Sequence, residues 1–304
     1  MFKGKLELQG IKDLLSKTVS FALDENHLFE TLHIPVIKEN NVCLYNKKTL
    51  QMTQHALSLT PQVDKGTAYC CTTENTVFCC GGCNSSDVYE VNAQSGAVER
   101  PPGMHQNKDY AGIFNLSGKC VLLFGGVNKH YEKGYVFGGW IKNYLKTVEK
   151  YDLERKAWTE LPSMEVEKYS CSVCQHSSGL YISGFSDTTR ETTIELFNPI
   201  SETCRLLHTE VGFSGILCCV QDELYHIRSS LIEVGSLTTG QTSIAFTQKG
   251  TVPKEGSGAY WLCCPASVVE GKVVGMFVAN GTRCGLFRFE SETVQFSQVV
   301  SFNY

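Results

Sequence analysis

A short apolar strand that ends in two small residues recurs along the chain. The clearest copies are residues 77–82 (VFCCGG) and 121–126 (VLLFGG), and residues 180–184 (LYISG) form a weaker copy. Another apolar segment precedes each copy, and a segment of alternating apolar and polar residues follows it. Alternation with period two, bounded by Gly, Asn, Ser and Pro, indicates β-strands rather than helices. The chain is therefore predicted to be all-β and built from repeated units.

The alternating segments set the period of the repeat. Their last residues recur about every 50 positions with variable loops between them, at Tyr45, Val91, Tyr151, Phe197, Val234 and Phe289. A period of about 50 residues is typical of a four-stranded propeller blade. Six such blades need about 300 residues, and the chain has 304. The pattern predicts one domain, a six-bladed β-propeller, rather than two domains.

The third unit carries the most complete motif. It contains the Gly-Gly pair at 125–126, Tyr151-Asp152, Trp158 and the sequence LPSM at 161–164. Glycines allow the strand to end in a sharp, closely packed turn, and the two aromatic residues supply apolar area between neighbouring blades. This arrangement resembles the repeat of the eukaryotic Kelch family. The resemblance extends over about residues 42–301, and it implies a Kelch-type propeller over residues 28–304.

The two ends of the chain depart from the repeat. Residues 1–27 are expected to form an N-terminal extension, because their apolar residues fall mostly at helical spacing, as in a short amphipathic helix. The first repeat has no Gly-Gly strand, and residues 28–40 could supply one or two irregular strands. How the ring closes in this first unit is left open.

Fifteen cysteines invite a metal or redox interpretation. Adjacent cysteines on a strand point to opposite faces, so they are expected to be reduced thiols that pack in the core. The motifs Cys80-x-x-Cys83 and Cys171-x-x-Cys174 fall at non-equivalent places in their repeats, which argues against a shared zinc site. A strand end also supplies no helix dipole to lower a thiol pKa. With no catalytic motif in the sequence, we expect no metal, no cofactor and no catalytic residue.

Candidate binding residues lie in the loops between second and third strands, which meet at one mouth of a propeller. The loop at 127–147 is longer than its counterparts and rich in aromatic residues. It is predicted either to bind a partner or to pack over the ring. The candidates in these loops are Lys129, His130, Tyr131, Tyr135, Trp140, Arg190, Arg228 and Arg283.

A basic residue shortly before the first strand of a blade is a further feature that the family resemblance implies. Lys108 and Lys168 occupy this place. Each is interpreted either as a contact for an acidic partner or as a solvated loop charge.

Charge and hydropathy narrow the class of function. A net charge of −4 gives no electrostatic footprint for nucleic acid, and no apolar run has the length of a membrane helix. The N-terminus lacks the apolar core of a signal peptide, so a cytoplasmic protein is expected. The expected function is non-enzymatic: a scaffold or substrate-recognition module that binds other proteins, in a ubiquitin-ligase or cytoskeletal complex. The alternative is a Kelch-type oxidase or sugar mutarotase that uses the channel mouth.

Overall fold

The computed structural model describes residues 33–303 with gaps at 39, 50, 65, 83, 131–140, 213–214, 229–230, 239, 252–266, 270–271, 280–282 and 291–294. Residues 38, 129–130, 141–143 and those from 267 onward are described by their backbone alone. The expected N-terminal helix within residues 1–27 lies outside the described residues. No helix that could cross a membrane occurs in the part of the chain that the structure describes.

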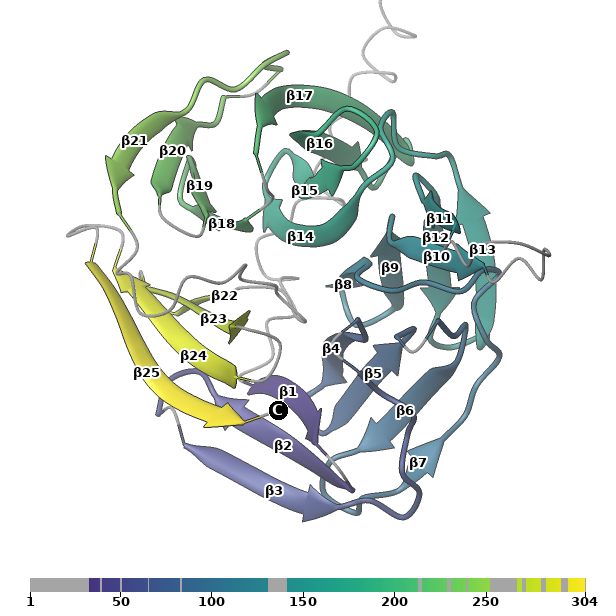
Figure 1. Cartoon of the computed structure of the whole chain (residues 1–304). Helices are drawn as coiled ribbons and strands as arrows, with labels where there is room; N and C mark the ends of the chain where they lie inside the picture. Colours follow the sequence, from purple (N-terminus) through teal and green to yellow (C-terminus); the bar gives the residue numbers. More distant parts are fainter. Residues whose placement is uncertain are drawn as a thin grey trace, which may run out of the picture.

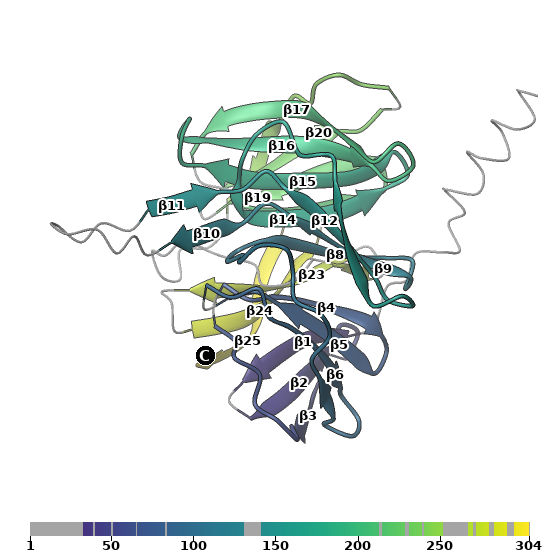
Figure 2. The same ribbon diagram turned by 90° about the vertical axis from the view of Figure 1, so that its right-hand side faces the viewer.

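The described regular structure consists of antiparallel β-sheets, which confirms the all-β prediction. Six sheets have three or four strands, and one further ribbon has two. The six sheets surround a common centre in a ring, and the first and last sheets are neighbours (Figures 1 and 2).

The first three sheets and the ribbon come from the N-terminal half of the chain. The strands of the first sheet are β1 (His33–Lys38), β2 (Asn41–Asn46) and β3 (Met52–Ala56). Those of the second are β4 (Ala68–Thr73), β5 (Thr76–Cys80), β6 (Val88–Asn92) and β7 (Val98–Glu99). Those of the third are β8 (Gly112–Leu116), β9 (Cys120–Phe124), β12 (Val148–Asp152) and β13 (Ala157–Leu161), with the ribbon β10 (Val127–His130) and β11 (Ile141–Tyr144) inserted between β9 and β12.

The other three sheets follow in chain order. The fourth is formed by β14 (Tyr169–His176), β15 (Gly179–Ser186), β16 (Glu191–Asn198) and β17 (Thr203–Val211). The fifth is formed by β18 (Ile216–Val220), β19 (Glu223–Ile227), β20 (Ile232–Ser236) and β21 (Thr247–Gly250). The sixth is formed by β22 (Ser267–Val269), β23 (Lys272–Ala279), β24 (Arg283–Glu290) and β25 (Gln295–Asn303).

The turn that follows the register mark repeats the same hydrogen bonds in four of the sheets. In four sheets the side-chain oxygen of an Asn or Asp accepts the backbone N–H groups two and three residues further on, at Asn46, Asn92, Asp152 and Asn198. Such Asx turns reverse the chain without a glycine. Each of the four follows a residue that the sequence predicts as a register mark, so those marks identify equivalent positions in the fold.

The first sheet is short of one strand in the described residues. Its register mark, Tyr45, lies on β2, whereas the corresponding marks lie on the third strand of the other sheets. By this register β1 corresponds to a second strand, and no described residue occupies the first-strand place. The sequence predicts an irregular first unit, and the first sheet is the one whose described strands differ from the repeat.

The core lies between neighbouring sheets. Phe78 from β5 packs against Tyr151 from β12, with ring centroids 5.2 Å apart, and Trp158 from β13 lies 4.9 Å from Tyr151. Phe124 and Phe197 make an edge-to-face contact between the third and fourth sheets. The predicted role of Tyr151 and Trp158 as apolar contacts between units is confirmed. Large rings suit this position because they bridge the widening gap between sheets that fan out from a centre.

Two glycine pairs, at 81–82 and 125–126, connect the second sheet to the third and the third sheet to the fourth. Gly82 N–H donates to the backbone carbonyl of Lys108, and Gly126 N–H donates to that of Lys168, at 3.0 and 2.9 Å. Gly81 and Gly125 have φ of +66° and +62°, a region that glycine adopts without strain. A Cβ at Gly81 would lie 2.1 Å from the Lys108 carbonyl oxygen. Only glycine therefore allows this close approach between sheets.

We expect Gly81→Ala to lower the free energy of unfolding by about 3 kcal/mol, the sum of left-handed backbone strain and overpacking. Gly240→Ala is the matched control, because Gly240 has φ +77° but nothing lies within 4 Å of its added Cβ. It should cost about 1 kcal/mol, the backbone strain alone. Urea unfolding followed by circular dichroism measures both values, and equal losses in the two variants would contradict the steric explanation.

Candidate partner-binding face

The two lysines that precede first strands are buried rather than exposed. The side chains of Lys108 and Lys168 are both 0% exposed. Lys108 Nζ lies 3.1 Å from Glu149 Oε1 and donates to Thr147 Oγ1 at 2.6 Å. Lys168 Nζ donates to Glu195 Oε1 at 2.7 Å. Both interpretations drawn from the sequence, a contact with an acidic partner and a solvated charge, are wrong for these two residues, because a partner cannot reach either ammonium group.

The buried glutamates tie each loop to its own sheet. Glu195 on β16 accepts the backbone N–H groups of Glu165 and Val166, which belong to the loop that leads into β14. Glu149 on β12 accepts the backbone N–H of His105 in the corresponding loop of the third sheet. Burial lowers the pKa of Lys108, and the nearby Glu149 carboxylate opposes that effect. A buried charge is tolerated only with such a partner, so these pairs hold the loops at the mouth of the ring in place.

A group of aromatic and charged side chains lies next to the Lys168 loop. It comprises Tyr144, Tyr169, Phe185, Asp187 and Arg190, and is called the tyrosine patch below. The rings of Tyr144 and Tyr169 stack with centroids 5.1 Å apart, and Tyr169 meets Phe185 edge-to-face. Tyr144 Oη donates to Asp187 Oδ2 at 3.0 Å, and Arg190 Nη1 donates to Asp187 Oδ1 at 2.8 Å. Three segments distant in sequence thus meet through side-chain contacts.

The patch combines fixed polar groups with an accessible charge. Burial raises the pKa of Tyr144 to about 12, and the hydrogen bond to Asp187 acts in the same direction, so the phenol keeps its proton. Arg190 is 73% exposed, and its φ of +63° places it in a tight turn between β15 and β16. The ion pair with Asp187 orients this guanidinium while leaving most of it open to solvent.

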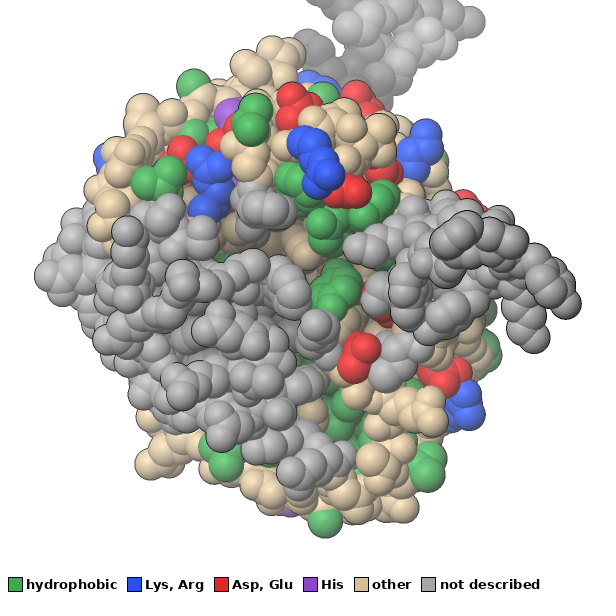
Figure 3. Space-filling model, viewed as in Figure 1, with side chains coloured by type: hydrophobic (Ala, Val, Ile, Leu, Met, Phe, Trp, Pro, Cys, Tyr) green, Lys and Arg blue, Asp and Glu red, His purple; other side chains and the backbone are tan. Residues whose placement is uncertain are grey.

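The ribbon β10–β11 projects from the same side of the ring. Figure 2 shows the two strands extending beyond the sheets on the side that faces the viewer in Figure 1. Tyr144, at the end of β11, joins the base of the ribbon to the tyrosine patch. On this face hydrophobic side chains are exposed near the middle of the ring, with charged side chains spread around them (Figure 3).

The structure places the remaining sequence candidates in different settings. Lys129 and His130 lie in β10, and Arg283 is the first residue of β24. Tyr131, Tyr135 and Trp140 lie outside the described residues. Tyr144 and Asp187 belong to loops that the sequence predicts at the mouth of the ring, although neither is among the named candidates, and Tyr169 was missed. The sequence signal that could have identified Tyr169 is its position directly after Lys168, the lysine that precedes the first strand of the fourth sheet.

The Arg228 side chain is largely buried and paired with two carboxylates. Its Nη2 lies 3.2 Å from Glu210 Oε2 and 2.7 Å from Glu233 Oε2, and its side chain is 16% exposed. Little of the guanidinium is left for a partner, in contrast to Arg190. The predicted contact role of Arg228 is therefore not supported by its position.

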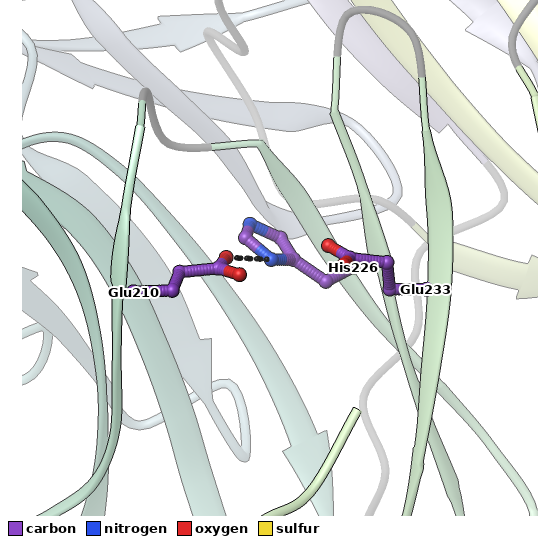
Figure 4. A group of neighbouring side chains, drawn as sticks. All are labelled: Glu210, His226 and Glu233. Atoms are coloured by element: carbon purple, nitrogen blue, oxygen red, sulfur yellow. Dashed lines mark ion pairs between the residues drawn. The ribbon is translucent and has the colours of Figure 1, made fainter. Parts of the chain in front are cut away.

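Glu210, His226 and Glu233 come close enough to be considered as metal ligands (Figure 4). Gly215 N–H donates to His226 Nε2 at 3.1 Å, which places the proton of the neutral ring on Nδ1. That nitrogen lies 3.1 Å from Glu210 Oε1, at ion-pair distance but without hydrogen-bond geometry. Arg228 already supplies the positive charge between the two carboxylates. These residues and Arg228 form an internal ion-pair network.

The described cysteines are thiols. Eleven of them are described, and eight of these are buried, as the sequence predicts. Burial raises the pKa of the Cys171 thiol to about 11 and that of Cys80 well above its usual range. Thiols held protonated are poor nucleophiles, so the two Cys-x-x-Cys motifs lack the environment that redox catalysis requires at these positions. Cys83 lies outside the described residues.

Comparison with known proteins supports the resemblance seen in the sequence. Residues 135–165 match the Kelch motif, a segment that includes β11, β12 and β13. The match covers Tyr151, Asp152, Trp158 and the sequence at 161–164, whereas the Gly-Gly pair at 125–126 lies outside it. No curated protein matches the chain.

We expect Lys168→Met to lower the free energy of unfolding by about 3–5 kcal/mol, because it leaves the Glu195 charge buried without a cation. The double variant Lys168→Met/Glu195→Gln should lose less than the single variant, since the amide carries no charge. Arg190→Met removes one partner of an exposed ion pair and should cost under about 1 kcal/mol. The single variant Glu195→Gln completes the double-mutant comparison, and chemical denaturation gives the free energy of unfolding of each protein. Additive losses in the double variant would exclude coupling between the two side chains.

A second prediction concerns the acid stability of the fifth sheet. Burial alone would raise the pKa of Glu210, but His208, His226 and Arg228 outweigh it, so the pKa lies well below its usual range. The unfolded chain therefore takes up this proton first as the pH falls, and the stability that Glu210 contributes is lost below about pH 5. In Glu210→Gln the free energy of unfolding should fall less steeply between about pH 5 and pH 3. The exposed Glu160→Gln is the control, and its pH profile should follow that of the wild type.

Proposed function

We propose that this chain is a six-bladed Kelch-type β-propeller that binds other proteins through the face carrying the tyrosine patch. Six sheets of three or four strands form the ring, and the Kelch motif lies at the base of the ribbon that marks this face. Kelch propellers commonly serve protein interaction. The chain would act in the cytoplasm as a scaffold or as a substrate-recognition module, in a ubiquitin-ligase or cytoskeletal complex.

The tyrosine patch is the observation that carries this proposal. Tyr and Arg are enriched at the energetic centres of protein interfaces, where a large side chain is already held in place before binding. Tyr144 and Tyr169 are stacked and half-buried, and Asp187 orients Arg190. Little side-chain entropy remains to be lost when a partner covers these groups. A partner with an acidic or carbonyl-rich loop would match the exposed guanidinium.

The same side chains are less suited to catalysis. Burial raises the pKa values of both Tyr144 and Tyr169. A general acid or base works best with a pKa near the operating pH, whereas these phenols stay protonated, and Tyr144 donates a hydrogen bond to Asp187. In this proposal the face recognises a partner and no bond is made or broken there.

We expect Arg190→Glu to weaken binding of the native partners by about 30-fold or more, the effect of losing an interface centre worth about 2 kcal/mol. Tyr144→Ala should also weaken binding. Affinity purification from the native cell with quantitative mass spectrometry identifies the partners, and titration of one purified partner gives the affinity. The class of partner recovered separates a ubiquitin-ligase role from a cytoskeletal one.

Arg155→Glu is the matched control for this experiment. Arg155 is 83% exposed and lies in the turn between β12 and β13, at the opposite end of the strands from the tyrosine patch. It should leave partner binding unchanged. Loss of partners in Arg155→Glu together with full retention in Arg190→Glu and Tyr144→Ala would place the binding surface on the other face.

A further inference from the structure

Two cysteines from neighbouring sheets touch at the inner part of the ring. Cys174 lies on β14, the first strand of the fourth sheet, and Cys219 lies on β18, the first strand of the fifth. Their Sγ atoms are 3.2 Å apart. A disulfide has a sulfur–sulfur distance of about 2.05 Å, so the two atoms need to move only about 1 Å closer to form one.

The two thiols differ in exposure. Cys174 is 4% exposed and packs with Tyr181, Leu217 and Leu224 between the two sheets. Cys219 is partly exposed. An oxidant dissolved in water therefore reaches Cys219 first. The Cys174 sulfur is buried and contacts the Cys219 sulfur. Partial exposure of one thiol beside a second, buried thiol is the arrangement of a redox-sensitive cysteine with its resolving partner.

We propose that Cys174 and Cys219 form a reversible disulfide that joins the fourth and fifth sheets when the protein meets a peroxide. The Cys219 thiolate attacks one oxygen of hydrogen peroxide, the O–O bond breaks, and a sulfenic acid and hydroxide result. The Cys174 sulfur then attacks the Cys219 sulfur, the S–S bond forms and the S–O bond breaks, and the Cys174 proton passes to the sulfenic oxygen, which leaves as water. With the two thiol protons the balance is two thiols and one peroxide to one disulfide and two waters.

Burial favours the order of these two steps. It raises the pKa of the Cys174 thiol well above its usual range, and the contact with Cys219 adds to this effect. Cys174 therefore keeps its proton and is a poor first nucleophile. Once Cys219 is a sulfenic acid, the two sulfurs already lie within van der Waals contact, so the second step needs no diffusion.

The bridge would change how the ring is held together. The described contacts between the fourth and fifth sheets at this place are packing and hydrogen bonds, such as that from Leu217 N–H to Ser172 Oγ. A disulfide between residues 45 positions apart restricts the unfolded chain. It also fixes the fourth sheet, which carries Tyr169 and Arg190, to its neighbour. This inference does not depend on the proposed binding function.

The test uses the full chain, treated with a small molar excess of hydrogen peroxide under native conditions. Non-reducing digestion and mass spectrometry should find the peptide containing Cys174 linked to the peptide containing Cys219. The thermal midpoint should rise by about 5 °C, and dithiothreitol should reverse both changes. An unchanged midpoint with both cysteines still open to alkylation after unfolding would overturn the proposal.

Two variants separate the bridge from general oxidation. Cys219→Ser should lose the linked peptide and the rise in midpoint, with a reduced-state midpoint close to that of the wild type. Cys204→Ser is the matched control, because Cys204 is also partly exposed but lies on the outer strand β17. It should keep both changes. A peroxide-induced rise that persists in Cys219→Ser, or a link from Cys219 to a different cysteine, would contradict the assignment.

Discussion

The buried lysine that precedes a first strand connects its own loop, its own sheet and the preceding sheet. The ammonium group of Lys168 is bound by Glu195 of its own sheet, while its backbone carbonyl accepts the N–H of Gly126 from the preceding sheet. Lys108 makes the corresponding contacts with Glu149 and Gly82. The ammonium group of each lysine fixes the loop against its own sheet, and the backbone carbonyl of the same lysine binds the preceding sheet. One residue therefore determines both the position of the loop and the spacing between the two sheets.

The tyrosine patch depends on this arrangement. Tyr169 directly follows Lys168, so the ion pair that buries the lysine also fixes where the tyrosine ring can stack on Tyr144. Ser170, the second residue of β14, then adopts a φ of +52° where the pairing with β15 is irregular. The face that we propose for binding is thus rigid at its centre because the residues beneath it are held by buried charges. Exposed groups such as Arg190 need only a single contact, with Asp187, to be oriented.

Much of the fold could be predicted from the sequence, because strand alternation, glycine pairs and aromatic positions are local signals. The marks at Tyr45, Val91, Tyr151 and Phe197 correspond to equivalent turns, and the glycine pairs lie where sheets approach each other. The binding face was harder to predict. A lysine in a polar loop resembles a solvated charge, and its burial depends on a glutamate 27 residues away. The contact of Tyr144 with Tyr169 and Asp187 likewise joins segments that no local pattern relates.

The fifth sheet explains why the repeat weakens in sequence while the sheets persist in structure. Glu233 follows the buried Ile232 on β20, as Glu149 follows Val148 on β12 and Glu195 follows Ile194 on β16. Its cation is Arg228, which comes from the loop after β19 rather than from the loop before β18. A largely buried glutamate on the third strand requires a positive charge within contact distance. The chain can supply that charge from more than one loop. A sequence pattern that searches for lysine at one position therefore misses the fifth sheet, although the same electrostatic requirement is met there.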